Sequence, residues 1–223
     1  MAILIHTISG APRPWRVLLG LAFKGLAWET RLLSASDGDL RSDAFLSISP
    51  RGTVPVLESG DVLLRDSIAC LAWLDRAYPK PPLFGKTAAA SAQIWQQTME
   101  TCDYLRDASH ELLSRAFSST PPAKGSDKYS KLEAGADAMH FECKRLNKAL
   151  EDRPFLSGNQ PSAVDAVTFP ELRLVQRAVE TKHELMSELG FGELSSLYPA
   201  LAEWKIRVEE YPGVWETMPP HWS

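Results

Sequence analysis

The chain of 223 residues has few cysteines, and their spacing argues against two kinds of site. The three are Cys70, Cys102 and Cys143. An odd number of widely separated cysteines, with no Cys-x-x-Cys pair and no histidine at ligand spacing, argues against a disulfide framework and against a structural zinc site. We therefore expect three buried thiols and no metal.

The sequence also lacks a surplus of one charge and a long apolar run. Its 24 basic and 28 acidic residues leave a net charge of -4, which gives no general attraction to nucleic acid or anionic lipid. The apolar start, residues 1–5, is too short to span a membrane and has neither the basic region nor the cleavage site of a signal peptide. These absences predict a cytoplasmic protein that acts on small molecules, without nucleic acid or membrane partners.

The first third of the chain has the pattern of an α/β domain. Residues 2–7 form a short apolar run before the turn-rich segment 9–14, which predicts a buried strand. Helical spacing from Trp15 to Gly25, followed by alternation over 28–33, completes a βαβ unit. The elements expected next are a short helix at 42–48, strands at 54–57 and 62–64, and a helix at 67–78. This order predicts a thioredoxin-like domain over residues 1–78.

A proline lies inside one of these expected strands. Pro55 stands within the apolar run 54–57. Proline cannot donate a ladder hydrogen bond and is excluded from central strands. We therefore expect Pro55 at a strand start, at a sheet edge or in a cis turn.

No strand pattern appears in the rest of the chain. Residues 79–85 begin with three prolines within four positions, which predicts a stiff linker between domains. The helices expected beyond it cover 88–117, 128–150, 162–180 and 198–211. Residues 86–223 are therefore predicted to form an all-helical C-terminal domain.

Two neighbouring segments carry a specific signature. Residues 49–57 read SPRGTVPVL, and residues 64–69 read LRDSIA. Together they resemble the glutathione-binding signature of the glutathione S-transferase superfamily, a proline-x-glycine-x-valine-proline-x-leucine run followed by an acidic residue and a serine that open a helix. The sequences WRV at 15–17 and YPALAEW at 198–204 also resemble that family, so the resemblance spans the chain and is strongest to the serine and cysteine classes, such as zeta or theta.

The resemblance implies a glutathione site whose chemistry agrees with the residue types. A cis Pro55 would turn Val54 outward, so that its N–H and C=O could pair with the glutathione backbone as a strand does. Ser67, at a helix N-terminus that favours anions, could hold the γ-glutamyl carboxylate, and Asp66 could hold the ammonium group. The alternative is that Asp66 and Ser67 only cap the helix.

The sequence offers several candidates for the group that activates the glutathione thiol. The thiol has a pKa of about 8.5 and needs a donor or a positive field to ionise at neutral pH. The family's spacing puts that donor at Ala11, whose side chain cannot donate. We expect Ser9 to replace it, and the alternatives are His6, Thr7, or the helix N-terminus assisted by Arg13.

Other conspicuous residues have mainly structural roles in this interpretation. Ser162 and Asp165 are expected to form a capping box at the start of a core helix. Tyr104 and Arg106, on the helix that faces the thiol in the family, are candidates for the electrophile pocket. Structural or solvent-exposed positions are expected for the remaining histidines and packing positions for several tryptophans, which are His110, His140, His183, Trp73, Trp95, Trp204 and Trp215.

The sequence therefore predicts a glutathione transferase, with glutathione as co-substrate. Its bound thiolate would attack a small hydrophobic electrophile by addition or substitution, and the resemblance implies a homodimer with a detoxifying role. One alternative is a glutathione-dependent isomerase, although the serine-rich turn of that class is missing. The other is a module that binds glutathione or another protein without catalysis, which the absence of a hydroxyl at Ala11 favours.

Overall fold

The computed structural model describes residues 2–120 and 122–222. The chain forms two compact units. One contains the N-terminal residues up to Ala92 together with the segment from Glu209 onwards, and the other runs from Gln93 to Val208. The C-terminal segment thus belongs to the N-terminal unit, whereas the sequence had placed it in the helical domain.

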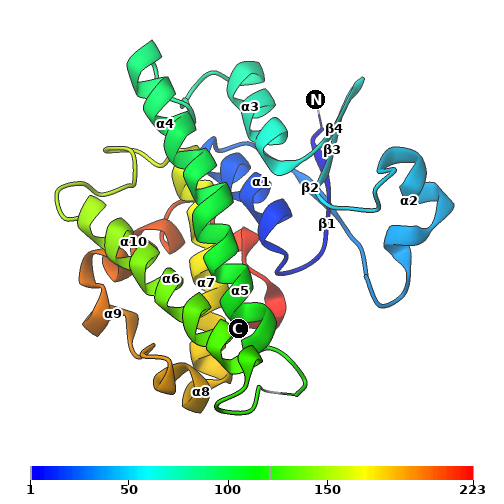
Figure 1. The fold of residues 1–223 in the computed structure, drawn as a ribbon. Helices are drawn as coiled ribbons and strands as arrows, with labels where there is room; N and C mark the ends of the chain where they lie inside the picture. The colour runs from blue at the N-terminus through cyan, green and yellow to red at the C-terminus, as the bar shows by residue number, and fades with distance from the viewer. Residues whose placement is uncertain (1, 121, 223) are drawn as a thin grey trace. The chain divides into compact units, whose positions relative to one another are not determined.

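The N-terminal unit contains a four-stranded mixed sheet. Its strands are β1 (Leu4–Thr7), β2 (Glu29–Leu32), β3 (Val56–Ser59) and β4 (Val62–Arg65), in the order β2-β1-β3-β4. Strand β2 is parallel to β1, and the other pairs are antiparallel. Helices α1 (Pro12–Phe23) and α3 (Ser67–Ala77) cover one face, and the short α2 (Asp43–Ile48) lies on the other (Figure 1). This arrangement confirms the predicted thioredoxin-like fold.

Helix α1 is the centre of the N-terminal unit. Its residues from Pro14 to Phe23 are all buried. At Gly20 the helix approaches α3 so closely that an added methyl carbon would lie 2.3 Å from the Leu71 side chain. Only a glycine fits this helix crossing without a shift of Leu71.

A buried lysine fixes the end of α1 to the start of the linker. Lys24 Nζ donates to the carbonyl oxygens of Tyr78 and Pro81 at 2.7 and 2.6 Å, and to Asp75 Oδ1 at 3.3 Å. Burial lowers the pKa of Lys24 more than the Asp75 carboxylate raises it. The ammonium group thus satisfies a carbonyl at the C-terminus of α3 and one in the linker.

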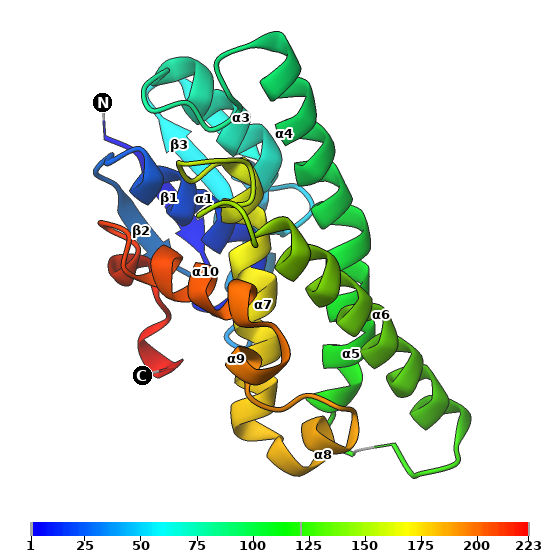
Figure 2. The same cartoon turned by 90° about the vertical axis from the view of Figure 1, so that its left-hand side faces the viewer.

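The second unit is helical. Its elements are the rest of α4 (Ala88–Glu100), a π-helical segment (Thr101–Leu105), α5 (Arg106–Ala116), α6 (Asp127–Ala149), α7 (Ala163–Thr181), α8 (His183–Glu188), α9 (Leu194–Leu197) and most of α10 (Pro199–Glu209). Helix α5 lies beside both α6 and α7 (Figure 2). The four expected helices are present, but the π-helical segment within the first was not predicted, nor were the short α8 and α9.

A buried carboxylate organises the start of α7. Asp165 is fully buried and accepts hydrogen bonds from the N–H groups of Leu156 and Ser162, at 2.9 and 2.8 Å, and from the Ser162 hydroxyl. It also accepts from Trp204 Nε1 at 2.8 Å. Burial raises the pKa of Asp165, and these bonds oppose that rise. The predicted capping box is confirmed, and it joins α7 to the preceding loop and to α10.

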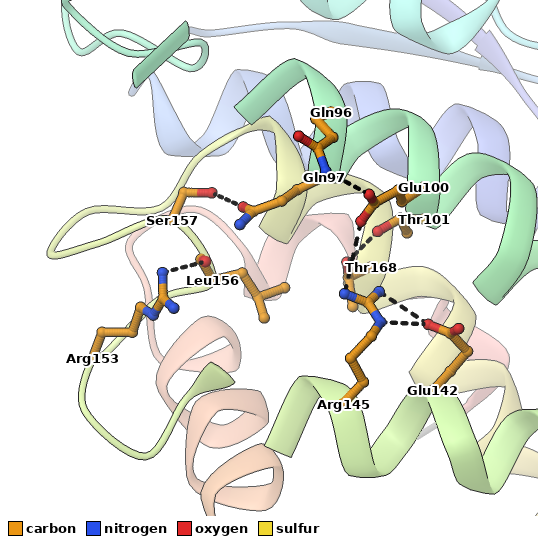
Figure 3. A network of polar contacts seen from close by, with 10 residues as sticks. All are labelled: Gln96, Gln97, Glu100, Thr101, Glu142, Arg145, Arg153, Leu156, Ser157 and Thr168. Atoms are coloured by element: carbon orange, nitrogen blue, oxygen red, sulfur yellow. Dashed lines mark hydrogen bonds and ion pairs between the residues drawn. The ribbon is translucent and has the colours of Figure 1, made fainter. Parts of the chain in front are cut away.

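Polar contacts also tie α4 and the π-helical segment to their neighbours (Figure 3). Arg145 on α6 binds Glu142 at 3.0 Å and lies 3.9 Å from Glu100, which in turn accepts from Gln96. Further contacts join Ser157 to Gln97, Thr101 to Thr168, and Arg153 to the Leu156 carbonyl. The Ser157 and Thr168 contacts link the loop after α6 and helix α7 to the same long helix, whereas the Arg153 contact lies within that loop.

Several expectations about individual side chains can be compared with the structure. Cys70 and Cys143 are buried, which raises the pKa of each to about 12. Cys102 is only half-buried, so the prediction of a third buried thiol was wrong. His140 has a structural role, since it bonds Tyr198 and the Leu189 carbonyl and stacks on Phe191.

The packing prediction for the tryptophans holds for one residue and fails for another. Trp204 is fully buried, whereas Trp215 is 73% exposed and does not pack in the core. Among the described residues, no helix is long and apolar enough to cross a membrane. No group of three or more His, Cys, Asp or Glu side chains in the described part of the chain could hold a metal ion.

We expect Asp165→Ala to destabilise the fold strongly. The substitution leaves the buried donors of Leu156, Ser162 and Trp204 without their acceptor, and each such loss costs about 1–3 kcal/mol. A total loss of at least about 3 kcal/mol should appear in urea denaturation. Asp137→Ala, at an exposed position of α6, is the matched control. Equal denaturation midpoints for the two variants would contradict the role given to Asp165.

Candidate functional site

The turn before α1 is closed by its own backbone. Ala11 N–H donates to the Ile8 carbonyl at 3.1 Å, and Gly10 has a φ of +77°. A glycine at the third position of a four-residue turn readily adopts this left-handed conformation. Ala11 is the residue that precedes the helix, and its side chain makes no capping bond. The turn therefore presents Ser9 and Gly10 at its tip.

The first turn of α1 can offer few backbone donors to an anion. Pro12 and Pro14 have no amide hydrogen, and the Trp15 N–H already bonds the Ala11 carbonyl at 3.2 Å. The Arg13 N–H is left as the amide that this turn can offer, and the Arg13 side chain is exposed. An anion here would gain less from the helix N-terminus than at a helix with all of its amides.

The three candidate donors of β1 and the turn have different surroundings. His6 is 1% exposed, and its Nε2 lies 2.5 Å from Glu58 Oε1. Thr7 is 4% exposed, and its hydroxyl donates to the Ile8 carbonyl at 3.3 Å. Ser9 is half-buried, and its Oγ lies 3.3 Å from His221 Nδ1. Ser9 is the most accessible of the three.

The loop that leads to Val54 is held by the hydrogen bonds of a serine side chain. The Ser49 hydroxyl donates to the Thr53 carbonyl at 2.9 Å and accepts from the Thr53 N–H at 3.2 Å. The Val54–Pro55 peptide is cis, as one of the alternatives for Pro55 required. Sheet pairing begins one residue later, at Val56. Val54 therefore lies half-buried at the entrance to β3, outside the ladder.

The start of α3 combines a cap with an unusual backbone conformation. Asp66 has a φ of +87°, and its Oδ1 accepts from the N–H groups of Ile68 and Ala69 at 2.8 and 3.2 Å. A positive φ is uncommon for a residue other than glycine, and such conformations gather at functional sites. The capping role is thus present, while Oδ2 gives the exposed carboxylate a further acceptor. Ser67, the first residue of the helix, is 1% exposed.

The structure separates the two candidates for the electrophile pocket. Tyr104 is 65% exposed and lines a hollow of about 740 Å³ between α5 and α6, together with Phe141. Arg106 instead bonds the Cys102 carbonyl and the neighbouring Asp107 on its own helix. Among the described residues that line the hollow, Tyr104 is present and Arg106 is not. Arg106 therefore does not line this hollow.

The sequence did not indicate that the C-terminal segment reaches the turn before α1. Trp15 Nε1 donates to Thr217 Oγ1 at 2.8 Å, and the rings of Trp15 and Trp222 meet edge to face at 5.4 Å. A methyl carbon added to Gly10 would lie 3.2 Å from the Trp222 ring. This segment consists of two short 3₁₀ turns, Trp215–Thr217 and Pro220–Trp222. Neither has the periodicity that would predict its partner.

The chain is similar in sequence to known glutathione S-transferases. Residues 11–77 match the family model of the glutathione S-transferase N-terminal domain. The chain is 28% identical to glutathione S-transferase theta-1 of Bos taurus over 90% of this chain and 80% of that protein. It is 46% identical to glutathione S-transferase Z1 of Arabidopsis thaliana over 36% of this chain and 37% of that protein.

A solved structure extends the similarity to the whole chain. The glutathione S-transferase of the Antarctic clam Laternula elliptica aligns with a TM-score of 0.82 and 26% identity. The alignment covers 100% of this chain and 94% of the clam protein. The two units of this chain therefore have the fold of that enzyme.

The loop before Val54 gives a direct test of its packing. Gly52 has a φ of +61°, and a methyl carbon there would lie 2.6 Å from the Leu40 carbonyl oxygen. Gly52→Ala should therefore cost more than the strain of about 1–2 kcal/mol that a left-handed alanine carries. Gly25→Ala is the matched control, because Gly25 has a φ of +62° and nothing within 4 Å of the added carbon. If thermal or urea unfolding shows the same loss for both variants, the close approach to Leu40 does not constrain this loop.

Proposed function

We propose that the chain is a glutathione transferase, because residues 11–77 match the N-terminal domain model of that family and the whole chain aligns with a solved glutathione S-transferase. Glutathione binds to the N-terminal unit, and its thiolate adds to a small hydrophobic electrophile or displaces a leaving group from it. The observation that carries the proposal is the start of α3, where Asp66 adopts a strained φ of +87° directly before Ser67.

The proposed site matches the charges and backbone of glutathione. Val54 N–H and C=O pair with the cysteinyl backbone of the ligand, because Val54 lies just outside the sheet ladder. The γ-glutamyl carboxylate binds at the N-terminus of α3, where the helix dipole and the Ser67 hydroxyl favour an anion. The Asp66 carboxylate caps the helix through Oδ1 and offers Oδ2 to the γ-glutamyl ammonium group.

The thiol then lies at the N-terminus of α1 in this proposal. Ser9 donates its hydroxyl hydrogen to the sulfur and so stabilises the thiolate. The accessibility of Ser9 supports this choice over His6, which is buried against Glu58, and Thr7, which bonds a backbone carbonyl. Arg13, exposed in the first turn of α1, adds a positive charge near the same end.

The proposal extends to assembly and location. The family resemblance implies a homodimer, and the lack of a surplus of one charge favours a cytoplasmic location. Two exposed aromatic side chains, Tyr104 and Phe141, are each 65% exposed beside the hollow between α5 and α6. Exposed aromatic surface of this kind supports an interface with a second copy of the chain.

We expect Ser67→Ala to weaken glutathione binding by about 1.5–3 kcal/mol, since a hydroxyl bonded to a carboxylate contributes about that much. Asp66→Asn keeps a capping oxygen and the tolerance for positive φ but removes the negative charge, so it should lower affinity with little change in stability. Calorimetry of glutathione binding, with thermal unfolding as a check of the fold, measures both. Wild-type affinity in both variants would show that these residues only cap α3.

We expect Ser9→Ala to raise the pKa of the bound glutathione thiol and to lower turnover at neutral pH. One unit of lost thiolate stabilisation corresponds to about 1.4 kcal/mol, and the rate should recover as the pH rises. Affinity should stay nearly constant, because the γ-glutamyl contacts remain. Ala11→Ser, tested beside it, should increase activity at neutral pH if the turn has transferase geometry. A wild-type pH-rate profile for Ser9→Ala, with no gain in Ala11→Ser, would favour a protein that binds glutathione without turning it over.

A further inference from the structure

We propose that His221 is a positioning residue for the glutathione thiol. In this proposal the His221 Nδ1–H donates to Ser9 Oγ, and the Ser9 hydroxyl hydrogen is thereby directed to the sulfur. The proposal rests on the proposed function, because it requires glutathione at the N-terminus of α1. It adds a residue from the far end of the chain, 212 positions from Ser9.

The C-terminal segment follows α1 along its whole length. Near the end of α1, the rings of Phe23 and Tyr211 meet edge to face at 5.4 Å. One residue earlier, Ala22 lies 3.5 Å from the position of a carbon added to Gly213. Val214 is fully buried, so the segment packs against the N-terminal unit as part of its core.

A hydrogen bond and a ring contact hold the C-terminal segment at Trp15. The indole Nε1 of this buried residue donates to Thr217 Oγ1 at 2.8 Å, and the Thr217 hydroxyl donates to the Val214 carbonyl at 2.7 Å. Beyond this point Trp222 packs against Trp15 and covers Gly10. These contacts on both sides of His221 place its ring over the turn that contains Ser9.

The hydrogen bond between His221 and Ser9 leaves the Ser9 hydroxyl hydrogen available for a second partner. The two atoms Ser9 Oγ and His221 Nδ1 are 3.3 Å apart. A serine hydroxyl has one hydrogen and two lone pairs, so when Oγ accepts from Nδ1–H its own hydrogen remains available to a thiolate. Hydrogen bonds in such a chain polarise one another, which makes Ser9 a stronger donor.

The rest of the turn explains why such a partner matters. Ala11 has no hydroxyl, and the prolines at 12 and 14 remove two amides from the helix terminus. A single serine at the tip of a turn would rotate freely between solvent and sulfur, whereas His221 selects one orientation. The C-terminal segment thus supplies orientation that the first turn of α1 does not.

A double-mutant cycle tests the proposal. The four proteins are the wild type, His221→Leu, Ser9→Ala and the double variant, and the readout is the pKa of the bound glutathione thiol from its ultraviolet thiolate absorbance. His221→Leu should lower the thiolate fraction at neutral pH by about three- to tenfold, and it should have no further effect when Ser9 is alanine. His221→Asn, which keeps a donor near the Nδ1 position, should restore most of the loss.

Controls separate orientation from stability. His183→Leu, at an exposed position at the start of α8, should leave the thiol unchanged. The unfolding midpoint and the glutathione affinity of His221→Leu should match those of the wild type. A wild-type thiol pKa in His221→Leu, or an equal shift in the Ser9→Ala background, would overturn the role of His221. Failure of the wild type to bind glutathione would overturn the proposed function as well, and that result is visible before any variant is made.

Discussion

The packing of α1 on all of its sides is the constraint on which the N-terminal unit depends. This helix lies against the sheet and against α3, with Gly20 at the closest approach to Leu71. Its C-terminal end passes into Lys24, which binds the end of α3 and the linker. Its remaining side is covered by the C-terminal segment through Trp15 and Thr217. Because α1 is held in this way, the turn at its N-terminus has a fixed position relative to β3 and α3.

That fixed position brings together residues that are distant in sequence. The turn with Ser9 follows β1, whose neighbour β3 begins just after Val54, and β4 leads into the strained Asp66. The antiparallel pairing of β1 with β3 and of β3 with β4 therefore places the candidate thiol donor and both candidate glutathione contacts at one end of the sheet. A short hairpin and one helix are enough to assemble the site, so most of it is encoded in the first third of the chain.

This locality explains what could be predicted from the sequence. The apolar alternation and the turn residues of segment 2–78 depend on interactions between neighbours in the sequence. The strands and helices were therefore predicted within a few residues of their true bounds. The helix cap at Asp165 was predicted from a spacing of three residues, but its bond to Trp204 was not, because that partner lies 39 positions away. The π-helical turn at Thr101–Leu105 has no periodic signal, and Trp215 was expected at a packing position although it is exposed. The path of the C-terminal segment depends on long-range contacts between single aromatic rings, which no local pattern reports.

Under the proposed function, the N-terminus of α1 has to activate a thiol although the side chain of Ala11 offers no donor. A helix start with prolines at 12 and 14 has a backbone prepared for the helix but few amides for an anion. The side chain of Ala11 adds nothing, and in the proposed site the hydrogen bond to the sulfur comes from the turn before the helix. There Ser9 is accessible, while His6 and Thr7 are buried and bonded elsewhere. A hydroxyl placed on a turn rather than on the helix is less constrained by its own backbone, and this is why we propose that the ring of His221, 3.3 Å away, sets its direction.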